Sequence, residues 1–364
     1  MPQQQHIIVL KHYIAGTLRW EFQAQGSVHS SPTISHDGNV VVVASWDHNV
    51  YALSSLDGSM IWSHETKDKI DSSVLILNSN VIVAGWDGFV TCLSLDSGDV
   101  QWTTNTKSGG VVSSPTLSSE LDLILVGTWN AEILALDVTT GSIMWRTSTD
   151  SEIEASVVST SNGIAYVGTV SGTLYSFREK TGQILETFSF RETRPGVSSP
   201  VNVPAGIASS ALVGSEKRVY VALTDGRLVA LYDPSSQYGT LSALCDVSKC
   251  ARPMLSMDIS HSGRSLQAVP KYNVKDPSIK KTMNVILWSR KFESSIVSSP
   301  SVGAFNALYV ATYSGVLYVL DVITGHTRWR FETTNSPIVS SPAISDDGTS
   351  QLSLSLSLSC VCMK

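Results

Sequence analysis

One sequence unit repeats along almost the whole chain. It is clearest at residues 112–145, where a Ser-Ser-Pro start is followed by an apolar run, a polar turn at Asn130, a second apolar run, a Thr-Gly turn and Trp145. Short runs of β-branched and aromatic residues between turn signals predict strands rather than helices. Each unit therefore predicts four short strands.

Two markers of the unit recur in the same register. The small-residue start returns at Ser31, Ser114, Ser199, Ser299 and Ser341, with looser versions at Ser73, Ser156 and Ser256. The closing tryptophan returns at Trp20, Trp62, Trp102, Trp145, Trp288 and Trp329, and Glu186 takes its place in one unit. A period of about 42 residues with four strands per unit is typical of a β-propeller blade.

The second half of the unit also resembles a known sequence pattern. Ala135, Asp137, Thr140, Gly141 and Trp145 are similar to the tryptophan-docking motif of pyrroloquinoline-quinone-type propellers, and the same glycine-to-tryptophan spacing occurs at Gly16/Trp20, Gly58/Trp62, Gly98/Trp102 and Gly325/Trp329. The resemblance implies a propeller fold and a structural docking role for the six closing tryptophans. Its relatives include quinoprotein dehydrogenases, a bacterial outer-membrane assembly lipoprotein, sensor domains of kinases and the tail of an acyl-adenylating enzyme, so it implies no single function.

The repeat arithmetic predicts one all-β domain, an eight-bladed β-propeller of four-stranded antiparallel blades at residues 1–350. Seven fuller blades are expected at 28–62, 70–102, 111–145, 153–186, 196–245, 254–288 and 297–331. The eighth is split between 6–22 and 338–358, so the N-terminal and C-terminal strands are expected to share one blade and close the ring. Residues 351–364 form an atypical Ser/Leu tail outside the repeat pattern.

Composition narrows the possible partners. The formal charge of −6 comes from interspersed acidic and basic residues, without the basic stripe that nucleic-acid binding requires. No apolar run approaches the roughly 20 residues needed to span a bilayer. Residues 1–13 lack the features of a secretory leader, and the five cysteines include no Cys-x-x-Cys pair. These observations favour a monomeric, cytoplasmic protein in a reduced compartment.

A second aromatic series precedes the middle turn of several units: Trp46, Trp86, Trp129 and Tyr313. We expect it on the loop face that carries the blade-to-blade connections. Aromatic residues gathered at a rim are favoured anchors for protein partners, whereas the alternative reading is packing of one hairpin on the next. The Ser-Ser-Pro starts likewise predict packing and backbone hydrogen bonding on the innermost strands, with a polar channel lining as the alternative.

The sequence favours binding over catalysis. It has no pair of adjacent cysteines and no insertion long enough for the calcium ligands and catalytic aspartate of quinoprotein enzymes, and its eight histidines show no metal-ligand spacing. We therefore expect no catalytic residue, no metal and no cofactor. The expected function is a non-catalytic scaffold that binds another protein, or a further domain of a longer parent chain. The alternative is a quinone-dependent oxidoreductase or small-molecule sensor that uses the central funnel.

Overall fold

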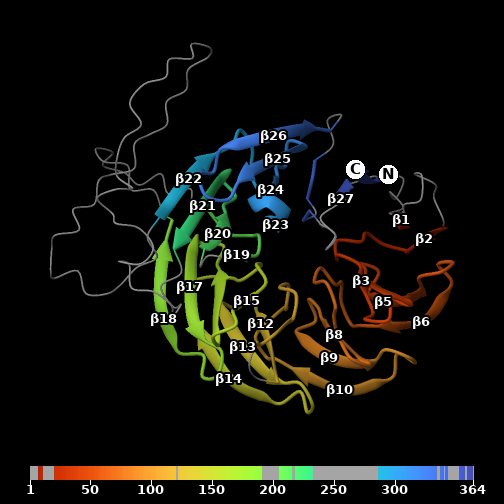
Figure 1. The fold of residues 1–364 in the computed structure, drawn as a ribbon. Helices are drawn as coiled ribbons and strands as arrows, with labels where there is room; N and C mark the ends of the chain where they lie inside the picture. Colours follow the sequence, from red (N-terminus) through yellow and green to blue (C-terminus); the bar gives the residue numbers. More distant parts are fainter. Residues whose placement is uncertain are drawn as a thin grey trace, which may run out of the picture.

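The computed structural model describes residues 7–10, 20–119, 122–190, 205–214, 218–232, 286–333, 337–339, 341–342, 352–356 and 359–363. They form six four-stranded antiparallel sheets and two two-stranded ones. The six sheets follow one another in chain order around a common centre (Figure 1). This arrangement confirms the predicted all-β fold of four-stranded antiparallel blades.

Each four-stranded sheet runs from an innermost to an outermost strand in chain order. Sheet one contains β3 (Thr33–Ile34), β4 (Val40–Ala44), β5 (Asn49–Ser54) and β6 (Met60–Glu65). Sheet two contains β7 (Leu75–Leu77), β8 (Asn80–Ala84), β9 (Phe89–Ser94) and β10 (Val100–Asn105). Sheet three contains β11 (Thr116–Leu117), β12 (Leu123–Gly127), β13 (Glu132–Asp137) and β14 (Ile143–Ser148).

The other three sheets repeat this plan. Sheet four contains β15 (Val158–Ser159), β16 (Ile164–Gly168), β17 (Thr173–Arg178) and β18 (Ile184–Ser189). Sheet five contains β19 (Leu212–Gly214), β20 (Arg218–Ala222), β21 (Arg227–Tyr232) and β22 (Ile286–Lys291). Sheet six contains β23 (Ser301–Gly303), β24 (Ala307–Ala311), β25 (Val316–Asp321) and β26 (Thr327–Glu332), with a short 3-10 helix, η2 (Ala304–Asn306), between its first two strands.

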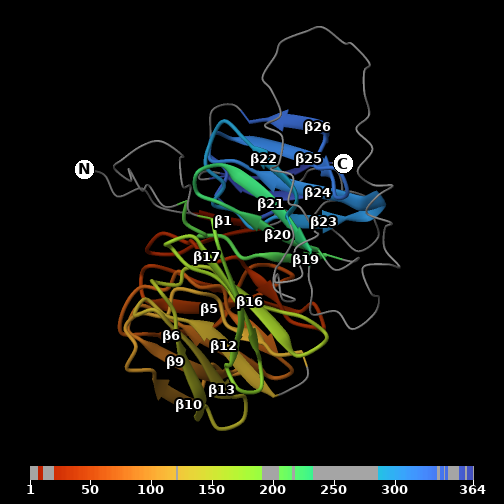
Figure 2. The same cartoon turned by 90° about the vertical axis from the view of Figure 1, so that its left-hand side faces the viewer.

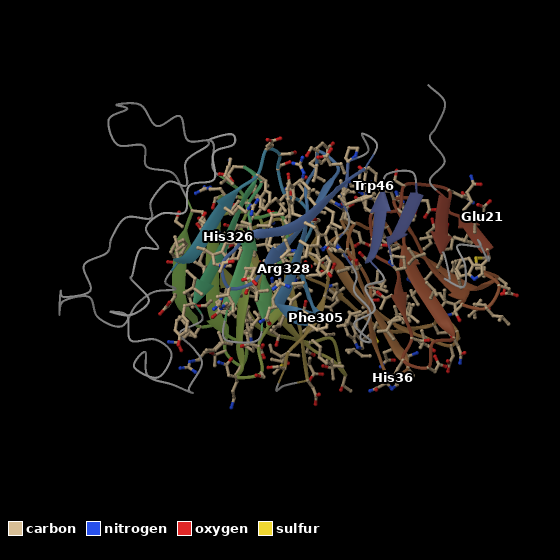
Figure 3. All side chains as sticks on the ribbon, turned by 45° about the horizontal axis from the view of Figure 1, so that its top comes forward. Glu21, His36, Trp46, Phe305, His326 and Arg328 are labelled. Atoms are coloured by element: carbon tan, nitrogen blue, oxygen red, sulfur yellow. The ribbon has the colours of Figure 1, made fainter. Side chains whose placement is uncertain are left out.

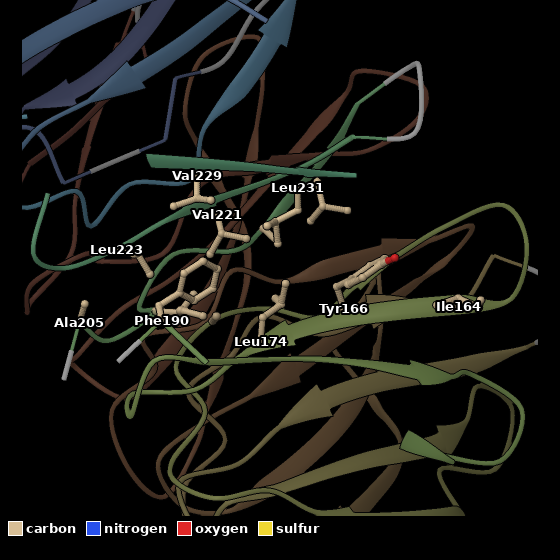
Figure 4. Packing of buried hydrophobic residues seen from close by; sticks show 13 residues of the cluster. Ile164, Tyr166, Leu174, Phe190, Ala205, Val221, Leu223, Val229 and Leu231 are labelled. Atoms are coloured by element: carbon tan, nitrogen blue, oxygen red, sulfur yellow. The ribbon is translucent and has the colours of Figure 1, made fainter. Parts of the chain in front are cut away.

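The two middle strands of each sheet are apolar runs because both of their faces pack against neighbouring sheets. Every residue of β12 is buried, whereas the outer strand β14 alternates between half-buried and exposed residues. Seen from the side, the sheets stack face to face (Figure 2). Between sheets four and five, for example, Tyr166 and Leu174 meet Val221 and Leu231 (Figure 4). The core therefore lies between sheets rather than at the centre of the ring.

The serine pairs of the repeat starts hold the inner strands together. The first serine bonds within its own sheet, as where the Ser30 hydroxyl donates to the Ala44 carbonyl at 2.7 Å. The second serine links sheets: the backbone N–H of Ser31, Ser73, Ser114, Ser156, Ser210 and Ser299 donates in turn to the hydroxyl of Ser73, Ser114, Ser156, Ser210, Ser299 and Ser341. These serines form a hydrogen-bonded belt from sheet one through sheet six to Ser341.

Two of the predicted blades contribute to a single sheet. The strand expected to close the blade at 254–288 is β22, and it pairs with β21 as the outer strand of sheet five. Ser210 of sheet five bonds directly to Ser299 at the start of sheet six, so the inner segments of these two sheets are neighbours. The observed pairing of β22 therefore differs from the predicted bounds, which assign β21 and β22 to separate blades at 196–245 and 254–288. The segment between β21 and β22 is long enough to hold one repeat, which is why the repeat arithmetic counts an additional blade there. Residues 233–285 of this segment lie outside the described residues.

The described residues contain six four-stranded sheets, so the count of eight blades stays a prediction. At the chain ends, β1 (Ile7–Leu10) pairs with β2 (Trp20–Gln23), and β27 (Leu352–Leu356) pairs with β28 (Ser359–Met363). These are two separate hairpins rather than one shared sheet, although β28 lies beside β1. Closure of the ring by the terminal strands therefore also stays a prediction.

We expect the terminal strands to open before the rest of the molecule. The two-stranded sheets of β1 and β27 offer fewer ladder hydrogen bonds than the middle of a four-stranded sheet, and serine, which alternates with leucine in the sequence of β27, has a low strand propensity. Hydrogen exchange measured by mass spectrometry should therefore be faster in residues 6–12 and 350–358 than in residues 123–127 of β12. Equal protection of the three segments would show that the ends form a blade as stable as the others.

Candidate functional site

The predicted aromatic residues lie where the turn between the two middle strands meets the segment entering the same sheet. The backbone N–H of Trp46, Trp86, Trp129 and Tyr313 donates to the carbonyl of Ser27, Lys69, Gly110 and Ser295, respectively. Trp46 stands at the opposite end of its sheet from His36 (Figure 3). The aromatic series therefore shares one loop face with the blade-to-blade connections, as the repeat pattern predicts.

The side chains of this series remain accessible to solvent. Trp46 and Trp129 are each 37% exposed, Tyr313 is 50% exposed, and Trp86 is half-buried. Trp86 lies close to the segment that enters sheet three: a Cβ on Gly110 would lie 3.1 Å from Cε3 of the Trp86 ring. The glycine at position 110 thus makes room for the indole.

A single carboxylate joins Trp46 and Trp86. The indole N–H of Trp46 donates to one oxygen of Asp71, and the indole N–H of Trp86 donates to the other. Lys69 lies against both rings, with its Nζ 4.5 Å from each ring centroid. Hydrogen bonds to an ionised group and cation–π contacts are both stronger than neutral contacts of the same size. The two indoles of neighbouring sheets are therefore held in fixed orientations.

Ring contacts extend this cluster in both directions. His29 stacks on Trp46 with centroids 4.2 Å apart and planes 9° apart. Trp86 meets Trp129 of sheet three at 5.1 Å. We call the rings of His29, Trp46, Trp86 and Trp129 the aromatic row. The ring contacts of the described residues do not connect Tyr313, on sheet six, to this row.

A half-buried glutamate, Glu154, interacts with the charge of Asp71. Glu154 immediately precedes the inner-strand segment of sheet four, and Asp71 holds the same position in sheet two. Burial, followed by the negative charges of Asp71 and Glu152, raises the pKa of the Glu154 carboxyl above its usual value. This part of the loop face therefore gathers negative charge beside exposed indole rings.

Sequence reasoning found the tryptophans but missed His29, Lys69, Asp71 and Glu154. A signal was present in the repeat register, because His29, Asp71 and Glu154 all stand directly before the serine pair or its equivalent. Only three of the repeats carry a titratable residue there, so the pattern emerges when the units are aligned on the serines rather than on the tryptophans.

The closing tryptophans of the repeat lie between sheets. The indole N–H of Trp20, Trp62, Trp102, Trp145 and Trp288 donates to the carbonyl of Ser55, Leu95, Val138, Glu179 and Val322 in the following sheet. Next to the tryptophan, the pairing of the two outer strands shifts register, as between Ala135 and Leu136 in sheet three. Such bulges re-aim a side chain. Trp329 has the same register in sheet six but is 43% exposed.

Two other features, a metal site and a membrane-spanning helix, are absent from the described residues. These residues contain no group of three or more His, Cys, Asp or Glu side chains placed to hold a metal ion. They also include no helix that is long and apolar enough to cross a membrane. Three of the predicted site residues, Trp46, Trp86 and Trp129, belong to the aromatic row, where their side chains are both held in place and accessible to solvent.

Comparison with solved structures supports the architecture. The chain is similar to the crystal structure of BamB from Moraxella catarrhalis, with a TM-score of 0.66 and 17% sequence identity over 98% of this chain and 88% of that one. At this identity the likeness shows the fold alone. A comparison with proteins of curated function finds no match.

A family match corrects the predicted location. A family model described as outer membrane protein assembly factor BamB matches residues 12–110 and 86–236. This finding overturns the expected cytoplasmic location, because the family is described by a role at the outer membrane. The expectation rested on the lack of a leader-like pattern in residues 1–13, and a missing pattern does not define a compartment.

The two matched ranges overlap and together cover more than half of the chain. They include the aromatic row, the first part of the serine belt and four of the closing tryptophans, Trp20, Trp62, Trp102 and Trp145. The resemblance in the repeat pattern, the propeller-type sheets and the family model agree. The chain belongs to the family of BamB-like PQQ-repeat β-propellers.

Proposed function

We propose that this protein is a non-catalytic scaffold that binds another protein, or a further domain of a longer parent chain, through the aromatic row. The observation that carries the proposal is the shared carboxylate: Asp71 fixes the indoles of Trp46 and Trp86 while the row stays open to solvent. Binding to side chains that are already ordered loses less conformational entropy. Tryptophan is also enriched among the residues that dominate interface energies.

The family supports the same class of function. The proteins that the matching model describes are assembly factors, a role carried out by contact with other proteins. The row spans three consecutive sheets, so a partner that covers it would contact several repeats at once. A face built from several repeats is how repeat proteins form extended binding surfaces.

We expect the triple variant Trp46→Ala, Trp86→Ala and Trp129→Ala to lose its partner. Truncation of one central aromatic anchor costs about 2 kcal/mol or more, so loss of even one of the three contacts should weaken binding at least about thirtyfold. The partner is first captured with the intact protein, then purified, and its Kd for both proteins is measured by calorimetry. Circular dichroism checks that the variant is folded.

The matched control is Phe305→Ala, which removes an aromatic ring that is 87% exposed at a turn between β23 and β24, away from the row. This control should bind as tightly as the unmodified protein. Unchanged binding by the triple variant would contradict the proposal. Uptake of pyrroloquinoline quinone with calcium and dye-linked oxidation of alcohols would favour the alternative of a quinone-dependent enzyme.

A further inference from the structure

We propose that the face of the molecule opposite the aromatic row rests on an anionic lipid surface, into which Phe305 inserts its ring. This face, called the turn face, carries the turn between the first two strands and the turn between the last two strands of each sheet. It lies at the end that carries His36, away from Trp46 (Figure 3). The inference is independent of the proposed function, because it concerns another surface and another kind of partner.

The two most exposed large apolar side chains of the described residues both lie on the turn face. Phe305 is 87% exposed in the turn between β23 and β24, and Leu56 is 75% exposed in the turn between β5 and β6. Ile323, which holds the position of Leu56 in sheet six, is 47% exposed. The same position is polar in sheets two, three and four: Asp96, Thr139 and Lys180. Single exposed apolar residues are ordinary, but three on one face indicate an apolar contact.

The backbone at Phe305 is an independent reason to assign a role to this ring. Phe305 has a φ of +58°, and the equivalent residues of sheets one and two are Gly38 and Asn78, with φ of +75° and +53°. Each precedes the residue whose carbonyl accepts a hydrogen bond from the turn between the last two strands. Glycine and asparagine tolerate this left-handed region, whereas a bulky side chain is strained there. Because the ring is so exposed, packing within the described part of the chain does not offset the strain.

The backbone of this turn is suited to an apolar layer, because its carbonyl groups are already bonded. The Phe305 carbonyl accepts a hydrogen bond from Arg328 Nη1 at 2.6 Å. The Asn306 carbonyl accepts one from the backbone N–H of Val322 at 3.1 Å. An unbonded backbone group is costly in lipid, where no water replaces the missing bond. These two carbonyls need no water, so the turn can approach the lipid with its ring.

Positive charge surrounds the two turns of sheet six. Of the described charged side chains that hydrogen-bond to these turns, three are arginines and one is a carboxylate. Arg218 and Arg290 each donate to a turn carbonyl at 2.9 Å, and Arg328 also pairs with Asp321 at 2.6 Å. Each cation close to an anionic bilayer strengthens binding about fivefold. This charge complementarity favours anionic headgroups over neutral ones.

The test is cosedimentation of the whole protein with vesicles. One set contains phosphatidylglycerol and phosphatidylcholine in equal parts, and the other contains phosphatidylcholine alone. We expect reversible binding to the anionic set, with half of the protein bound at about 1 mM lipid, and at least about fivefold weaker binding to the neutral set. Phe305→Gly should weaken binding to the anionic set at least about fivefold, because it removes the inserted ring. The same variant should raise the urea midpoint of unfolding, because glycine tolerates the left-handed backbone.

The matched control is Asn78→Gly, which changes the equivalent turn of sheet two and should bind the anionic vesicles like the unmodified protein. Equal binding of both vesicle sets, unchanged binding by Phe305→Gly, or no binding up to about 10 mM lipid would overturn the inference. So would loss of the protein partner by Phe305→Gly without vesicle binding, which would assign the ring to a protein interface. The triple tryptophan variant should keep its vesicle binding, so the two proposals fail separately.

Discussion

Replacing Trp145 by alanine is expected to lower the free energy of unfolding by about 3–5 kcal/mol, as large aromatic truncations in packed interfaces do. Trp145 lies in the outer strand of sheet three and contacts sheet four in three ways. Its ring meets Phe177 edge-on at 5.8 Å, its indole N–H donates to the Glu179 carbonyl at 2.9 Å, and its Cε3 would lie 2.4 Å from a Cβ on Gly182. The substitution removes all of these contacts and leaves a cavity between two sheets.

Denaturant unfolding at equilibrium measures this loss. Met144→Ala is the matched control, because Met144 is the neighbouring residue on the same strand and is 58% exposed. Surface substitutions of this kind usually change stability by less than about 0.5 kcal/mol. If Trp145→Ala falls within that same range, the closing tryptophans are not the elements that join one sheet to the next.

Much of the fold was predictable because its signals are local and repeated. One unit already contains the apolar runs that form β12 and β13 and the glycines of its turns. The same runs and turns recur in the other units. The grouping of the strands into sheets was not predictable in the same way. Trp288 is a closing tryptophan, as predicted. Its strand, β22, pairs with β21, which ends at Tyr232, far upstream in the sequence. Repeat arithmetic measures length along the chain, whereas a blade is defined by pairing in space.

In the candidate site too, some residues were predictable from the repeat and others were not. The tryptophans of the row stand at a fixed place in their repeats, so the sequence indicated them. The roles of Asp71 and Lys69 depend on two sheets being side by side, since each of these residues contacts rings from both Trp46 and Trp86. No feature within a single repeat distinguishes Asp71 from an ordinary loop aspartate. Contacts of this kind become visible when neighbouring units are packed together.

The glycine opposite each closing tryptophan leads to a second large effect. Gly141 has a φ of +69°, and a Cβ at this position would lie 2.4 Å from Cε3 of Trp102. Gly38 has a similar φ of +75°, but a Cβ there would meet no atom within 4 Å. The left-handed backbone alone costs a non-glycine residue about 1–2 kcal/mol, and overpacking adds about 1–3 kcal/mol. We therefore expect Gly141→Ala to cost about 2–5 kcal/mol and Gly38→Ala about 1–2 kcal/mol.

A double-mutant cycle separates the two causes at Gly141. In a Trp102→Ala background the added methyl group no longer meets an indole ring, and Thr104 Oγ1 at 2.8 Å is its remaining close neighbour. The cost of Gly141→Ala should therefore fall toward that of Gly38→Ala, roughly 1–2 kcal/mol. Equilibrium unfolding of the single and double variants gives the coupling energy between positions 102 and 141. A coupling near zero would show that the strain at Gly141 comes from its backbone alone. A coupling of about 1 kcal/mol or more would show that the tryptophan ring itself excludes any side chain at position 141, and this would explain why a glycine recurs opposite the tryptophan of the preceding repeat.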